Sequence, residues 1–268
     1  MSAKDTLSDF ERRAFSSHDG ERRDVFWQGR GPAVVVISEI PGITPRVAEF
    51  GRRCVKHGYT AVMPNLFGVP GKPPSALYAL RSIGYACVSR EFTVLATRQS
   101  SPVIRWLRQL AQHAHERCGG PGVGVVGMCL TGNFALAMMA EPSVLAPVLS
   151  QPSLPFAVTR AQKRSLHLSD RELATARKRC AEGCQVLGLR FTGDAMVPSE
   201  RFERLRRELG DAFLAVEIDS SRGNPHGIPR TAHSVLTEHF VDTPGHPTRS
   251  ALNEVLALFD RSLRAGPA

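Results

Sequence analysis

The chain has 268 residues, 42% of them hydrophobic, and a formal net charge of +9. This length suits one large α/β domain with a substantial core. No run of about 18 apolar residues occurs, which argues against a transmembrane helix. No apolar signal core follows the polar N-terminus, so we expect a cytoplasmic protein that makes no membrane contact.

The positive charge is spread along the chain and does not form one stripe. The arginines occur in short, separated groups, and no nucleic-acid-binding motif accompanies them. We therefore expect no nucleic-acid partner and a small-molecule substrate, whose carboxylate the charge would help to attract. The sequence leaves open whether the protein is a monomer or a small homo-oligomer.

The six cysteines indicate free thiols, because disulfides are rare in the cytoplasm. Cys180 and Cys184 lack a second pair of ligands at zinc spacing, so we expect no metal site. The glycine-rich stretches also lack the spacing of a phosphate loop. We therefore expect neither a nucleotide nor any other cofactor.

The first half of the chain alternates apolar runs with helical patterns, after a polar segment at residues 1–23. The clearest strand is 33–38, a continuous β-branched run typical of a central parallel strand. The other predicted elements are a strand at 24–27, a helix at 45–57, a strand at 60–63, a Pro/Gly loop at 69–75, and helices at 78–91 and 102–118.

The second half continues this alternation after the stretch 123–139, which begins as a buried strand and ends as a helix. The predicted elements are a strand at 144–149, a loop at 152–163, a helix at 170–180, a strand at 185–192, a helix at 199–209, a strand at 213–218, a long polar loop, and a helix at 248–263. The pattern predicts an α/β fold with a mainly parallel central sheet and helices on both faces. We expect a single domain over 1–268, with a candidate lid or insertion at 152–184.

Residues 127–132, Gly-Met-Cys-Leu-Thr-Gly, join the strand directly to the helical pattern. Gly127 and Gly132 allow the two backbones to approach each other. Cys129 would then stand at the tip of the turn, where the helix dipole favours a thiolate. This is the form of a nucleophile elbow with Cys in place of Ser. The alternative is a buried structural cysteine at the end of a strand.

Catalytic residues of parallel sheets lie at the carboxyl ends of the strands, where the polar candidates are Glu39, Cys129, Asp194 and His226. The order nucleophile, acid, histidine is the chain order of α/β hydrolases. In this interpretation Cys129 attacks an acyl carbon, His226 transfers the proton, and Asp194 orients the imidazole. Asp194 alone could be a turn residue after Gly193, and His226 is one of nine histidines.

With these motifs the chain resembles the dienelactone hydrolase family, over about residues 24–262. The elbow is similar to the family's Gly-x-Cys-Leu-Gly-Gly. Residues 39–43, Glu-Ile-Pro-Gly-Ile, resemble its Glu-Ile-Phe-Gly-Val, and residues 194–198, Asp-Ala-Met-Val-Pro, match its Asp-x-x-Val-Pro. His226 and Arg230 keep its His-x-x-x-Arg spacing.

Two departures from the family pattern stand out. Thr131 replaces a glycine of the family's elbow, which would narrow the turn. The segment from nucleophile to acid is also longer, at 65 residues (194 − 129). A longer segment predicts a different lid over the pocket, and with it a different substrate.

The resemblance implies roles for further residues. Glu39 would take the thiol proton before substrate binds, although a Glu here could instead cap the next helix. Arg230 would bind a substrate carboxylate through its planar fork. The resemblance also implies a second substrate-binding arginine from a mobile segment, for which Arg90 is our choice and Arg81 its rival.

The backbone N–H groups of Leu130 and Ile40 would form the oxyanion hole. His233, in Ala-His-Ser, resembles the family's Gly-His-Ser and is the rival to His226. We prefer His226 because Arg230 follows four residues later.

These observations predict a hydrolase that opens a dienelactone-like, carboxylate-bearing lactone or ester through a Cys-His-Asp triad and an acyl-thioenzyme. A thioesterase or carboxylesterase acting on another small substrate is the alternative enzyme. A non-catalytic binding protein on the same fold is the alternative from a different class. The intact candidate triad argues against a binding protein.

Overall fold

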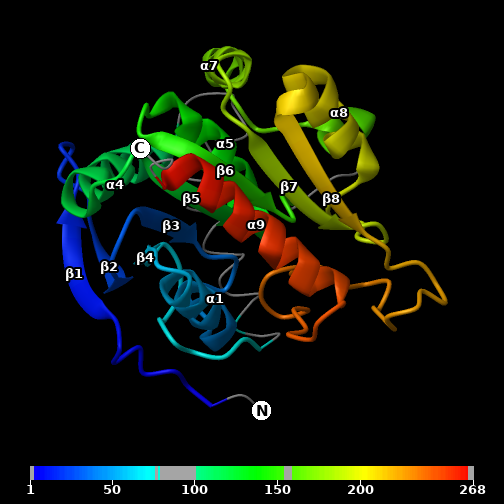
Figure 1. Cartoon of the computed structure of the whole chain (residues 1–268), viewed down its shortest axis with the longest axis horizontal. Helices are drawn as coiled ribbons and strands as arrows, with labels where there is room; N and C mark the ends of the chain where they lie inside the picture. The colour runs from blue at the N-terminus through cyan, green and yellow to red at the C-terminus, as the bar shows by residue number, and fades with distance from the viewer. Residues whose placement is uncertain (1–2, 76–77, 79–100, 154–158, 265–268) are drawn as a thin grey trace.

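The computed structural model describes residues 3–75, 78, 101–153 and 159–264. Its centre is an eight-stranded sheet with the order β1-β2-β4-β3-β5-β6-β7-β8 (Figure 1). The strands are β1 (Glu11–Ser16), β2 (Arg22–Gly29), β3 (Ala33–Ile37), β4 (Thr60–Pro64), β5 (Val123–Met128), β6 (Val144–Ser150), β7 (Val186–Phe191) and β8 (Phe213–Ile218). Each strand predicted between residues 24 and 218 is therefore confirmed, with small differences at the ends.

The sheet is parallel from β4 to β8 and antiparallel at its first edge, where β2 pairs with both β1 and β4. This confirms the prediction of a mainly parallel sheet. Strand β1 lies inside the polar segment 1–23 and was not predicted. It is almost wholly exposed at the sheet edge, so it carries no apolar run that a sequence pattern could detect. Its Phe15 ring packs edge-on against Trp106 and stacks on His113.

Helices cover both faces of the sheet, as predicted (Figure 1). One face carries α1 (Pro45–Lys56) and α9 (Pro247–Leu263), and the other carries α4 (Pro102–Cys118), α5 (Gly132–Ala137), α7 (Asp170–Ala181) and α8 (Ser199–Leu209). Strand β3 shows why both faces need cover. Its residues alternate between the two cores, with Val34 and Val36 on the α1 side and Val35 and Ile37 on the α4 side.

Two predicted segments differ from expectation or lie outside the description. A short helix, α6 (Arg160–Arg164), occupies part of the predicted loop 152–163. The predicted helix 78–91 falls almost entirely outside the described residues. The candidate lid at 152–184 stays a prediction, although its helix α7 packs on α5 and α8 within the helical layer. In the part of the chain that is described, no helix is long and apolar enough to cross a membrane.

Candidate active site

The elbow has the predicted strand–turn–helix form. Strand β5 ends at Met128, one 3-10 turn (η2, Cys129–Thr131) follows, and α5 begins at Gly132. Cys129 has φ of +57°, a left-handed conformation that is strained for a residue with a side chain and typical of nucleophile elbows. A Cβ on Gly127 would lie 2.1 Å from the carbonyl oxygen of Thr131, so a larger residue has no room. Because α5 has only six residues, its dipole is a smaller source of thiolate stabilisation than the sequence led us to expect.

Thr131, the departure from the family's glycine, turns its side chain back into the sheet. It is fully buried. Its hydroxyl accepts from the Met128 N–H at 2.9 Å, and it lies 2.8 Å from the carbonyl oxygen of Met128 and 3.0 Å from that of Ile37. These contacts tie the elbow to the carboxyl end of β3. Thr131 therefore braces the turn from behind.

Asp194 is paired with His233, which corrects our preference for His226. Asp194 follows β7, is buried, and has its Oδ2 atom 2.6 Å from Nδ1 of His233. Its other oxygen accepts from the Met196 N–H at 2.9 Å. Both acceptor positions are thereby occupied, and the carboxylate holds the imidazole in one orientation.

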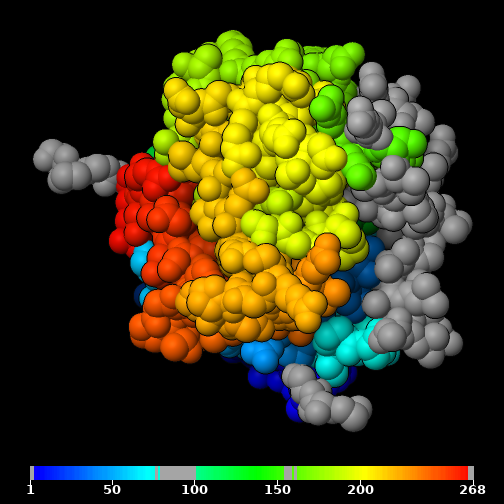
Figure 2. Space-filling model, turned by 90° about the vertical axis from the view of Figure 1, so that its right-hand side faces the viewer, coloured from blue at the N-terminus to red at the C-terminus, as the bar shows by residue number. Residues whose placement is uncertain are grey.

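His226 and Arg230 lie in the long loop between β8 and α9, where both are exposed. The ring of His226 packs edge-on against that of His246, with centroids 5.3 Å apart. Arg230 packs its backbone and Cγ against Gly193, beside Asp194. His226 and Arg230 are four residues apart as predicted, but the histidine hydrogen-bonded to Asp194 is His233. Figure 2 shows this loop at the surface in orange, beside α9 in red.

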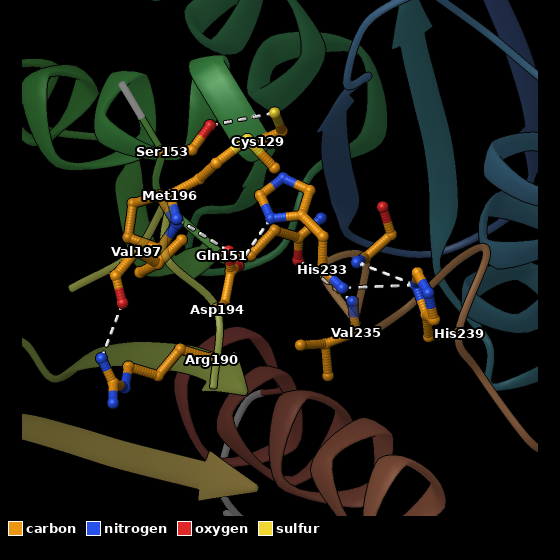
Figure 3. Close-up of polar contacts among 12 residues, drawn as sticks. Cys129, Gln151, Ser153, Arg190, Asp194, Met196, Val197, His233, Val235 and His239 are labelled. Atoms are coloured by element: carbon orange, nitrogen blue, oxygen red, sulfur yellow. Dashed lines mark hydrogen bonds and ion pairs between the residues drawn. The ribbon is translucent and has the colours of Figure 1, made fainter. Parts of the chain in front are cut away.

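The imidazole of His233 lies between Asp194 and Cys129 (Figure 3). Burial disfavours its charged form, but the hydrogen bond to Asp194 and the nearby sulfur of Cys129 outweigh this and raise the pKa of His233 to about 10. Its Nε2 atom is buried and makes no well-formed hydrogen bond among the described residues. The ring is thus charged at neutral pH, with Nε2 on the side of the sulfur.

His239 supports this loop from behind. Its Nδ1 atom accepts from the backbone N–H groups of His233, at 3.4 Å, and Ser234, at 3.3 Å. Burial, and then the charge on His233, lower the pKa of His239. Both effects keep Nδ1 unprotonated at neutral pH, which the acceptor role requires.

Glu39 lies at the end of β3, buried, but bonded differently from what the resemblance implied. Its Oε2 atom accepts from Ser234 Oγ at 2.6 Å and from Gln151 Nε2 at 3.2 Å, and its Oε1 atom accepts from the hydroxyl of Thr237. The two hydroxyls, of Ser234 and Thr237, belong to the segment that carries His233. Glu39 therefore joins the end of β3 to the histidine loop.

The thiol of Cys129 instead meets Ser153, which sequence reasoning missed. The Ser153 hydroxyl lies 3.0 Å from Sγ, and the Ser153 N–H donates to the Cys129 carbonyl at 3.0 Å (Figure 3). Ser153 comes just after β6, at the carboxyl edge where catalytic residues were sought. That position is the one signal that could have found it, since no motif includes it.

A fully buried arginine on α8 holds this part of the site together. Arg201 donates from Nη1 to the carbonyls of Pro152, at 2.5 Å, and Met196, at 3.2 Å, and from Nε to that of Ser165, at 3.1 Å. Burial lowers its pKa to about 10, so it stays charged at neutral pH. One side chain thus fixes the residues next to Ser153 and Asp194.

The remaining predicted residues fall into two groups. Leu130 is the second residue of η2, and Ile40 follows Glu39 directly, so both stand at neighbouring strand ends, as an oxyanion hole requires. Arg90 and Arg81 lie outside the described residues. Among the described residues, no group of three His, Cys, Asp or Glu side chains is arranged to hold a metal ion.

Comparison with known proteins shows the family of this chain. Residues 24–262 match the dienelactone hydrolase family. The chain belongs to that family. A protein of Saccharomyces cerevisiae named "Putative carboxymethylenebutenolidase" is 22% identical over 244 residues, covering 88% of this chain and 82% of the yeast protein. Membership of this family shows that the chain is a hydrolase. The family supports the hydrolysis of esters or lactones.

Solved structures of the dienelactone hydrolase type share the fold. A "Putative Dienelactone Hydrolase" from Klebsiella pneumoniae has a TM-score of 0.61 at 20% identity, covering 94% of this chain and 99% of that one. A dienelactone hydrolase-like promiscuous phosphotriesterase from metagenomic libraries has a TM-score of 0.57 at 17% identity, covering 96% and 100%. At these identities the likeness concerns the fold alone.

Proposed function

We propose that this dienelactone hydrolase relative cleaves a small ester or lactone through an acyl-thioenzyme on Cys129, with His233 and Asp194 completing the triad. The observation that carries the proposal is the imidazole of His233 lying between the Asp194 carboxylate and the Cys129 sulfur at the elbow. An imidazole that a carboxylate holds beside a cysteine sulfur supports a thiolate–imidazolium pair, which is the reactive form of a cysteine nucleophile.

In the first step, the Cys129 thiolate attacks the acyl carbon and the carbon–sulfur bond forms. The carbonyl oxygen becomes an oxyanion, which the backbone N–H groups of Leu130 and Ile40 would stabilise. As the carbonyl re-forms, the bond to the alkoxy oxygen breaks, and that oxygen takes the proton from Nε2 of His233. For a lactone the released alcohol remains attached to the acyl group.

In the second step, neutral His233 removes a proton from water while the water oxygen attacks the thioester carbon. The carbon–sulfur bond then breaks, releasing a carboxylic acid and returning Cys129 as a thiolate. The proton stays on His233, so the resting pair is restored. Asp194 stays ionised throughout and stabilises the imidazolium.

The test is the substitution Cys129→Ala, measured on a panel of lactones, aryl esters and thioesters. Hydrolysis should be lost on every substrate that the wild type cleaves, because the sulfur that forms the acyl intermediate is gone. The temperature of thermal unfolding should change little, since the alanine keeps the Cβ atom and removes no contact within the hydrophobic core. Near-normal turnover by the folded variant would refute the proposal. The panel also separates a lactonase from a thioesterase or carboxylesterase.

A finer part of the proposal is that Arg230 binds a carboxylate on the substrate. Its position against Gly193, next to Asp194, supports this, whereas its spacing to His226 supports it no longer. If His233 is the triad histidine, the family's spacing puts the arginine four residues later, and that position is Thr237. The hydroxyl of Thr237 is bonded to Glu39.

Arg230→Ala should therefore be assayed on a matched pair of esters, one acidic and one neutral. A charge-assisted contact is worth on the order of 1.5–3 kcal/mol, or roughly 10- to 150-fold in kcat/KM. The loss should fall on the acidic ester, mainly through KM. Equal values on both esters would show that Arg230 binds no substrate carboxylate.

A further inference from the structure

The thiol of Cys129 is hydrogen-bonded to Ser153 and not to Glu39, the residue that the resemblance implied. Glu39 was expected to take the thiol proton at rest. Both of its oxygens already accept hydrogen bonds, from Ser234, Gln151 and Thr237. The hydrogen bond that the structure gives to Sγ of Cys129 goes to Ser153.

We propose that Ser153 is a catalytic residue of this chain, which donates a hydrogen bond to the Cys129 thiolate, while Glu39 serves to position the histidine loop. This rests on the proposed function of Cys129 as the nucleophile. It assigns to Ser153 the tuning of the thiol, and to His233 the thiol proton.

Ser153 is built into the site. It is 4% exposed, and two contacts with the same residue fix it, one from its backbone N–H and one from its hydroxyl. The residue before it, Pro152, accepts a hydrogen bond from the buried guanidinium of Arg201. A residue whose backbone is fixed in this way keeps its hydroxyl in place at little further entropic cost.

The segment before Ser153 is tied to the other half of the site. Gln151 is fully buried, donates to Glu39, and accepts from the backbone N–H of Val235 at 3.3 Å. Glu39 and Gln151 together thus link the ends of β3 and β6 to the residues that follow His233. This network explains why Glu39 is buried without contributing a base.

The proton balance is simple. Sγ gives its proton to Nε2 of His233 and becomes a thiolate. The Ser153 hydroxyl keeps its proton and turns it toward the sulfur, so its hydrogen bond becomes charge-assisted. The same bond forms again when the carbon–sulfur bond breaks in deacylation, and there it stabilises the departing thiolate.

Alkylation of Cys129 by iodoacetamide from pH 5 to 9, followed at the Cys129 peptide by mass spectrometry, tests the proposal. A hydrogen bond to a charged group shifts an equilibrium by roughly ten- to a hundredfold. Ser153→Ala should therefore slow alkylation at neutral pH by about tenfold or more, and Ser153→Thr, which keeps the hydroxyl, should restore part of the rate. The matched control is Ser143→Ala, because Ser143 is a buried, hydrogen-bonded serine at the opposite end of β6; its rate should equal that of the wild type.

Glu39→Gln provides the decisive comparison. It should slow alkylation less than Ser153→Ala does, and lower kcat through the loosened histidine loop. The proposal is overturned if Ser153→Ala alkylates like the wild type at every pH, or if Glu39→Gln causes the larger loss of alkylation. Hydrolysis by Cys129→Ala reports separately on the proposed function. If that variant is inactive while Ser153→Ala alkylates normally, the nucleophile stands and the role of Ser153 falls.

Discussion

The two halves of the active site are held in place by different forces. Cys129 follows strand β5 directly and Asp194 lies three residues after β7, so the main chain of the sheet carries both to its carboxyl edge. His233 belongs to a loop of irregular structure after β8. Side-chain bonds hold that loop, from Glu39, Gln151 and His239. Residues that end a strand are therefore placed by local pattern, whereas a loop residue is placed by its partners.

Buried arginines reinforce the strand-end half. Arg190, on β7, donates to the Val197 carbonyl at 2.6 Å, and Arg201 donates to the Met196 carbonyl. Both bonds close the turn that carries Asp194. The loop half adds apolar contacts to its polar bonds, since Val235 and Leu236 pack in the core under α1 and α9. The contrast between main-chain and side-chain support leads to three predictions.

The largest effect is expected from the loop half. His233→Ala should reduce kcat/KM by roughly 10²- to 10⁴-fold, the usual contribution of a general acid–base group. His226→Ala, in the same loop but exposed, should change it little and serves as the matched control. Steady-state kinetics on one substrate would compare the two. A larger loss in the His226 variant would return the catalytic role to that residue.

A smaller effect, on stability, is expected from the strand-end half. Arg201→Met removes the donor from the buried carbonyl oxygen of Pro152, next to Ser153, and from that of Met196, two residues after Asp194. Leaving a buried acceptor without a partner costs about 1–3 kcal/mol, so the free energy of unfolding should fall by about that much or more. Arg204→Met is the control on the same helix, because its ion pair with Glu208 is partly exposed. Such pairs are worth about 0–1 kcal/mol.

Denaturant unfolding of both variants would measure this difference. Activity should fall with stability in the Arg201 variant, since the same bonds position the two strand-end residues. Equal unfolding free energies for the two variants would mean that Arg201 does not brace the site.

The smallest expected effect is a pH dependence of stability, which comes from His233, where the two halves meet. Asp194 and Cys129 raise the pKa of His233 to about 10 against the burial that lowers it. The folded protein thus binds this proton more tightly than the unfolded chain. The resulting stability is complete below the unfolded pKa of about 6.5 and is lost as the pH rises through about 10.

An NMR titration of the His233 ring would measure this pKa directly. In Cys129→Ala the pKa should lie lower, because the contribution of the sulfur is gone and that of Asp194 remains. The alkaline limb of kcat/KM should follow the same group, since the leaving alcohol takes its proton from the imidazolium. A wild-type value near 6.5 would contradict the thiolate–imidazolium pair.

The sequence by itself determined the alternation of strands and helices, the strand–turn–helix elbow at Cys129, and the place of Asp194 just after a strand. Each depends on residues that are near one another in the chain. A buried strand is a continuous apolar run, a tight turn needs glycine, and the end of a parallel strand points to the catalytic edge. The exposed strand β1 escaped because it buries too little to leave such a pattern.

Only the tertiary structure decided which histidine meets Asp194 and what Glu39 and Ser153 touch. Residues 219–246 contain several histidines, and spacing alone favoured His226. His233 is held beside Asp194 because its neighbours Ser234 and Thr237 bond to Glu39, which lies 195 and 198 residues before them in the chain. Bonds between residues so far apart form only when the sheet brings its strand ends together, and no local pattern encodes them.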